Sequence, residues 1–147
     1  HHFYKSKLIS YIFPIIQLID FKISWFFKRF TLIKNEKTIF DRFNIDTLAD
    51  LMVDTHNFKL HNDWVGKEFL KMTPNYTKMV ILDADEEKII LRKKDTLFDE
   101  NLVLKLKAYR ILANELNIKL IRNDLDFSLV NSKIIKYFND KNFSSKS

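Results

Sequence analysis

Residues 78–83 read Lys-Met-Val-Ile-Leu-Asp, and this stretch decides the fold class. Its apolar run is continuous instead of alternating with polar residues, which is typical of a strand buried on both faces of a parallel sheet. Shorter apolar runs occur at 37–41 (Lys-Thr-Ile-Phe-Asp) and 119–122 (Lys-Leu-Ile-Arg). We therefore predict three parallel strands, at 37–41, 78–83 and 119–122.

Apolar residues at steps of three and four fill the intervals around these strands. The spacing predicts helices over 5–31, 44–54, 62–71, 85–94, 99–116 and 127–139. Strands that alternate with helices predict an α/β fold, a three-layer arrangement in which helices sandwich a parallel sheet. We expect one domain over residues 1–141, followed by a polar tail at 142–147.

Composition excludes several classes of protein. The 147 residues include one glycine, Gly66, and no cysteine. One glycine cannot form a Gly-rich phosphate loop or a dinucleotide fingerprint, and the lack of cysteine excludes disulfide scaffolds and thiol catalysis. A cysteine-free chain fits a reducing cytoplasm, which is the expected compartment. The apolar run at 8–19 is shorter than the about 20 residues that a membrane span needs, so we expect no membrane partner.

The net charge of +6 indicates an anionic partner such as a phosphate ligand. Only five of the 25 basic residues are arginines, the side chain that binds phosphate in a bidentate manner. Asp41-Arg42, Asp83 and Arg122-Asn123-Asp124 each follow a predicted strand, where parallel sheets bind ligands. At such a position Asp-Arg is either a local ion pair that shapes the turn, or a phosphate-binding arginine beside a carboxylate that orients it.

The order of these residues resembles that of the thymidylate kinases. Residues 39–43 (Ile-Phe-Asp-Arg-Phe) are similar to the hydrophobic-hydrophobic-Asp-Arg-Tyr motif of that family. Residues 80–87, followed by Arg92, are similar to its Leu-Asp-x-x-x-Glu … Arg pattern, and residues 109–113 (Tyr-Arg-Ile-Leu-Ala) resemble its Tyr-x-x-Leu-Ala. The resemblance covers roughly residues 20–138 and is specific mainly through the order and spacing of the motifs.

The resemblance implies transfer of the γ-phosphoryl group of ATP to a nucleoside monophosphate, with dTMP as the expected acceptor and Mg²⁺ as the metal. Its implied partners are nucleotide substrates, with no specific nucleic acid and with a homodimer as one possible assembly. It also implies roles for individual residues. The implied catalytic pair is Arg42, which would contact the acceptor's phosphate, and Asp41, which would lie near Mg²⁺ through water. Phe43 and Asp46 would lie beside the acceptor. On the ATP side, Asn123 would lie near the adenine, and a lid would carry Arg92, Lys93 and Lys94.

Two features depart from the family pattern. The phosphate loop G-x-x-x-x-G-K-S/T is missing, which we interpret as N-terminal truncation, with a natural pseudo-kinase as the alternative. We therefore expect the chain alone to be inactive. Asp46 stands where the family has Ser, which leaves the choice of acceptor open; Asp46 has an alternative role as a helix cap.

Two other classes of function remain as alternatives. One is a non-catalytic module that binds nucleic acid or other anions through the basic surface. The other is a membrane-surface protein that uses the helix at 5–31.

Overall fold

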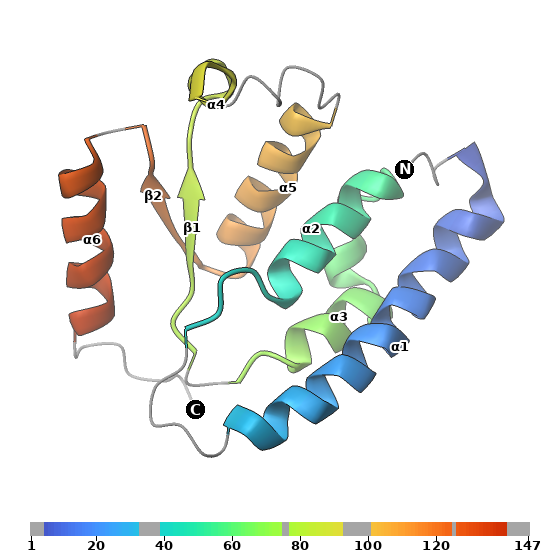
Figure 1. The fold of residues 1–147 in the computed structure, drawn as a ribbon. Coiled ribbons are helices and arrows are strands. Elements are labelled where there is room, and N and C mark those ends of the chain that lie inside the picture. Colours follow the sequence, from blue (N-terminus) through green and yellow to red (C-terminus); the bar gives the residue numbers. More distant parts are fainter. Residues whose placement is uncertain (1–4, 33–38, 75–76, 93–100, 125, 141–147) are drawn as a thin grey trace. The chain divides into compact units, whose positions relative to one another are not determined.

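The computed structural model describes residues 5–32, 39–74, 77–92, 101–124 and 126–140 (Figure 1). The chain forms two compact units, His1–Pro74 and Asn75–Ser147. Each unit has its own buried core, and each is described separately.

The first unit is helical. It contains α1 (Lys7–Leu32), α2 (Asn44–Asp54), a short 3₁₀ helix (Leu60–Asn62) and α3 (Trp64–Lys71). The prediction for 44–54 is confirmed at both ends, and α1 matches the prediction for 5–31 to within two residues. The helix predicted at 62–71 begins at Trp64, because residues 60–62 form the separate 3₁₀ turn.

The core of the first unit lies between α2, α3 and one face of α1. Leu48 and Met52 of α2 and Phe69 of α3 are fully buried, and the ring of Phe21 of α1 meets that of Phe69 edge to face at 5.5 Å. The chain's one glycine allows α3 to approach the 3₁₀ turn, because a Cβ atom on Gly66 would lie 2.1 Å from the carbonyl oxygen of Leu60.

The strand predicted at 37–41 is wrong over its described part. Residues 39–41 form no strand, and residues 37–38 lie outside the described residues. Ile39 is 96% exposed instead of buried, while the ring of Phe40 stacks on that of Phe43 at 5.0 Å. A strand requires a hydrogen-bonded neighbour, and none of the described residues pairs with this segment.

The second unit combines helices with a small sheet. It contains β1 (Val80–Asp83), α4 (Glu86–Arg92), α5 (Leu102–Glu115), β2 (Lys119–Arg122) and α6 (Phe127–Asn139). β1 and β2 are parallel, in a register that pairs Val80 with Lys119 and Asp83 with Arg122. α5 and α6 flank the two strands on opposite sides (Figure 1).

Local chemistry explains where several of these elements begin and end. Asn117 adopts the left-handed conformation (φ 52°) that Asn tolerates, which ends α5 and turns the chain into β2. Asp126 accepts a hydrogen bond from the backbone N–H of Ser128 (2.8 Å) and so caps α6. At the other end of α6, Lys78 donates to the backbone carbonyl of Asp140 at 2.6 Å.

The predicted α/β class is confirmed at the level of mixed helices and a parallel sheet. The strand at 119–122 is confirmed as predicted, and the strand at 78–83 is confirmed over Val80–Asp83. Within the described residues the sheet has two strands instead of three. Leu82 and Leu120 are exposed (46% and 39%), so these strands are not buried on both faces as the apolar run predicted.

Candidate functional site

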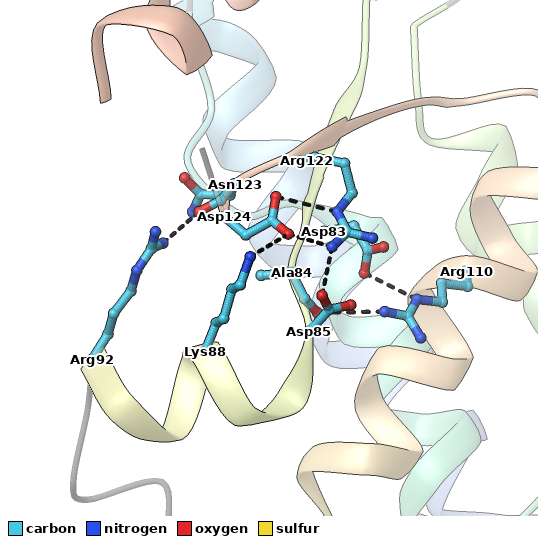
Figure 2. Close-up of polar contacts among 9 residues, drawn as sticks. All are labelled: Asp83, Ala84, Asp85, Lys88, Arg92, Arg110, Arg122, Asn123 and Asp124. Carbon is cyan, nitrogen blue, oxygen red and sulfur yellow. Dashed lines mark hydrogen bonds and ion pairs between the residues drawn. The ribbon is translucent and has the colours of Figure 1, made fainter. Parts of the chain in front are cut away.

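The parallel pairing of β1 and β2 brings the residues that follow both strands to one edge of the sheet. Asp83 lies opposite Arg122, and the backbone N–H of Asn123 donates to the carbonyl of Asp83 at 2.7 Å. Polar side chains from β1, α4, α5, β2 and the turns that follow the two strands gather there (Figure 2). We call this group the strand-end cluster: Asp83, Asp85, Lys88, Arg92, Arg110, Arg122, Asn123 and Asp124.

Arg110 of α5 anchors one side of the strand-end cluster. Its Nε lies 3.0 Å from Oδ1 of Asp83, and its Nη2 lies 3.3 Å from the carbonyl oxygen of Ala84. Asp83 is buried, so this ion pair compensates a carboxylate that has little contact with water. Arg110 therefore fixes the turn that follows β1.

Arg122 lies at the centre of the strand-end cluster. Its Nη2 donates to Oδ2 of Asp85 at 2.7 Å, and its guanidinium engages both oxygens of Asp124, with Nε 3.3 Å from Oδ1. Hydrogen bonding to Arg122 holds the pKa of Asp124 well below its usual range, and bonding to Asp124 and Asp85 raises the pKa of Arg122. The guanidinium is thus held in one orientation by two carboxylates.

Two cations of α4 reach the turn that follows β2. The Nζ of Lys88 lies 3.1 Å from Oδ2 of Asp124, and Nη1 of Arg92 donates to the carbonyl oxygen of Asn123. Arg92 and Asn123, which the sequence predicts on separate parts of a nucleotide site, are therefore in direct contact (Figure 2). Lys93 and Lys94 lie outside the described residues.

An open surface depression of about 440 Å³ lies beside the strand-end cluster. Its polar lining comes from the start of α4 and one face of α5, through Asp85, Glu86, Lys107, Arg110 and Asn114. Three apolar side chains of α5 complete it.

Asp41 and Arg42 lie in the first unit, and both are exposed. Arg42 has a φ of 62°, a left-handed conformation that is uncommon for a residue with a side chain. Within the described part of the first unit no ion pair joins Asp41 to Arg42, so the structure gives no support to the local ion-pair interpretation. Their roles toward an acceptor stay predictions.

Phe43 and Asp46 have structural partners in the same unit. The ring of Phe43 packs on that of Trp25 at 4.8 Å, and both side chains are half-buried. Oδ2 of Asp46 accepts the backbone N–H of Phe43 at 2.9 Å, from the first turn of α2. The helix-cap role considered for Asp46 is thus seen, with Asp46 inside the first turn instead of at the cap position.

No direct metal site occurs in the described segments, since no three or more His, Cys, Asp or Glu side chains there group closely enough to hold an ion. Mg²⁺ is commonly held by one or two carboxylates, by waters and by the phosphates of a nucleotide. Asp41 is exposed and has no ion pair among the described residues of its unit, and its water-mediated contact with Mg²⁺ stays a prediction.

Sequence reasoning did not assign a site role to Asp85, Lys88 or Arg110. A signal for part of this group was present in the composition. Three of the chain's five arginines, at positions 92, 110 and 122, belong to the strand-end cluster. Arginines are scarce here while lysines are abundant, so their convergence in space is informative.

Neither the protein-family models nor the curated proteins nor the solved structures gave a match to this chain.

Proposed function

We propose that this chain belongs to a kinase that transfers the γ-phosphoryl group of ATP to a nucleoside monophosphate, with dTMP to dTDP as the leading reaction. The observation that carries the proposal is the convergence of Arg92, Arg110 and Arg122 at the carboxyl ends of two parallel strands. Ligands of open parallel sheets bind at that edge, and guanidinium groups match the oxygens of phosphate.

The strand-end cluster would serve the donor nucleotide. Arg122 is held by Asp85 and Asp124 in a fixed orientation, which supports preorganised binding, because little reorientation is needed when an anion arrives. Lys88 and Arg92 add positive charge from α4. Asn123 would lie toward the adenine, and Lys93 and Lys94 continue the basic segment in the sequence.

The segment with Asp41 and Arg42 would serve the acceptor. A strained backbone at an exposed arginine is a feature that clusters at ligand-binding positions, and it supports a role for Arg42 on the acceptor's phosphate. Asp41 would hold a water of the Mg²⁺ that accompanies ATP. That ion would neutralise charge on the phosphates, while Arg42 stabilises charge on the transferred group.

The proposed reaction also needs parts that these 147 residues do not contain. A phosphate loop requires several glycines, and Gly66 is the only one here. We infer that the two-stranded sheet belongs to a larger three-layer sheet sandwiched by helices, in one domain over residues 1–141. In that arrangement a strand that carries the phosphate loop would border β1.

The binding half of the proposal is testable on the chain itself by NMR titration of the ¹⁵N-labelled protein with MgATP. We expect saturable shifts of the amides of Lys88, Asn123 and Asp124, with a dissociation constant of about 1 mM because no phosphate loop contributes. Arg122→Gln should weaken binding at least about tenfold, which corresponds to the loss of one charge-assisted contact.

Lys133→Gln is the matched control, because Lys133 is an exposed cation of α6 outside the strand-end cluster. It should leave the titration unchanged. Equal weakening by both variants, or equal shifts with inorganic phosphate alone, would indicate nonspecific attraction to a basic protein and contradict the proposal.

A further inference from the structure

Helix α1 has two apolar faces, and only one of them packs on its own unit. The inner face carries Leu18, which is 3% exposed, and the aromatic rings of Phe21 and Trp25. Trp25 meets Phe43 at 4.8 Å. Nζ of Lys22 lies 2.6 Å from Oε2 of Glu68 on α3. These contacts fix α1 against α2 and α3.

The opposite face is exposed along almost the whole helix. Six apolar residues recur there at alternating steps of three and four, which places them on one side of a helix, away from Leu18, Phe21 and Trp25. Each of them is 42–59% exposed. We call this set the outer stripe: Ile9, Ile12, Ile16, Ile19, Ile23 and Phe26.

Apolar exposure extends beyond the outer stripe. Leu8, Tyr11 and Phe27 are each 65–68% exposed, so the apolar arc is wider than the narrow seam of a two-helix coiled coil. Among the described helices, the segment Lys7–Lys28 is the one long and apolar enough to cross a membrane, and only 11% of its apolar window is buried. A core helix of this composition would be mostly buried.

The charges of the same segment favour an anionic surface. Residues 5–32 contain five basic residues and one acidic residue. Lys5, Lys7 and Lys28 are exposed. Helices that lie in a membrane interface combine an apolar face with lysine and arginine on the polar side and aromatic residues at the boundary.

We propose that α1 binds the surface of an anionic lipid bilayer, with the outer stripe in the boundary between headgroups and acyl chains and the helix parallel to the membrane plane. A spanning orientation would break the contacts of Phe21 and Trp25 and the Lys22–Glu68 ion pair, all of which join α1 to the folded unit. This proposal departs from the expectation of no membrane partner. That expectation was based only on the length of the consecutive apolar run at 8–19, which is too short to span a membrane. It is independent of the proposed kinase function.

The test is co-sedimentation of the full chain with vesicles of phosphatidylcholine that contain about 30% phosphatidylglycerol, or none. The variant Ile16→Gln/Ile19→Gln/Ile23→Gln should lower the partition coefficient at least about tenfold, because it removes apolar burial from the centre of the stripe. The matched control, Leu91→Gln/Leu129→Gln, removes exposed leucines of α4 and α6 and should bind as the unchanged chain does.

Charge and orientation are tested separately. Lys7→Gln and Lys28→Gln should each weaken binding to the anionic vesicles by about fivefold and leave binding to neutral vesicles unchanged. Alkaline carbonate should release the protein, and retention would contradict the surface orientation. If a second copy of the chain or the second unit covers the outer stripe instead, the chain will not bind the vesicles, and that result would overturn the proposal. Sedimentation velocity without vesicles distinguishes a second copy from the second unit. Only a second copy gives a dimer, and the variant Ile16→Gln/Ile19→Gln/Ile23→Gln should then be a monomer.

Discussion

Asn44 connects the segment that carries Arg42 to the end of α3, and its replacement by alanine has a predictable cost. The side chain is fully buried. Its Nδ2 donates to the carbonyl oxygen of Phe69 and to Oγ1 of Thr73, both at 2.6 Å, while its Oδ1 has no hydrogen-bond partner. Asn44→Ala therefore removes two good hydrogen bonds together with one unpaired buried acceptor.

The magnitude follows from these three contributions and the space left behind. Two hydrogen bonds contribute about 1 kcal/mol each to the free energy of unfolding, and relief of the unpaired oxygen returns about 1 kcal/mol. The cavity left by the missing amide costs about 1 kcal/mol more, in a core that already holds Phe69 and Leu48. We expect Asn44→Ala to lower the free energy of unfolding by about 2 kcal/mol.

Tryptophan fluorescence during urea unfolding measures this change in the first unit, because both tryptophans, Trp25 and Trp64, belong to it. With a urea slope of about 1 kcal/mol per molar for a unit of this size, the midpoint should fall by about 2 M. Asn62→Ala, at an exposed asparagine, should shift it by less than about 0.5 M. An Asn44→Ala midpoint equal to that of Asn62→Ala would refute the reasoning.

Three further predictions concern acid stability, packing and catalysis. Its two lysine partners lower the pKa of Glu68 to about 2, so the ionised side chain stabilises the folded unit fully above about pH 4.5 and loses this effect as pH falls toward 2. Over that pH range the urea midpoint of Glu68→Gln should therefore fall less than that of the unchanged chain. Gly66→Ala should destabilise the first unit by at least about 2 kcal/mol in the same unfolding assay, despite the helix propensity of alanine, because its Cβ would meet the backbone of Leu60; an unchanged midpoint would contradict that packing. In a form of the protein that carries a phosphate loop, Arg42→Ala should reduce turnover by about 10³ or more with little effect on ATP binding, and Arg42→Lys should restore only part of it. Near-normal turnover of Arg42→Ala in a coupled kinase assay would remove Arg42 from the reaction.

The helices could be predicted from the sequence because their periodicity is a local property. The ends of α2 and α6 match the predictions at 44–54 and 127–139, and Asp126 at the start of α6 is a recognisable cap. The strand at 37–41 was not predictable in the same way. A short apolar run forms a strand only beside a partner, and Phe40 instead packs with Trp25 and Phe43.

The candidate site could be predicted only in part. Strand-end positions pointed to Asp83 and to residues 122–124, because parallel strands place their carboxyl ends together. Lys88 and Arg110 come from helices, and the sequence does not reveal which side of a helix faces a strand end. The exposure of the outer stripe could not be predicted for a related reason, since its periodicity is equally typical of a core helix.

Phosphoryl transfer to dTMP is the direct test of the proposed kinase function. A form of the protein with a phosphate loop ahead of residue 1 would be incubated with dTMP, Mg²⁺ and ATP labelled at the γ-phosphate, and the products separated by chromatography. The proposal predicts label in the β-position of dTDP, in amounts that depend on enzyme, Mg²⁺ and Arg42. The same incubation is repeated with each of the other nucleoside monophosphates in place of dTMP. Absence of label from every diphosphate product would contradict the kinase function and identify the protein as a pseudo-kinase or another class of binder.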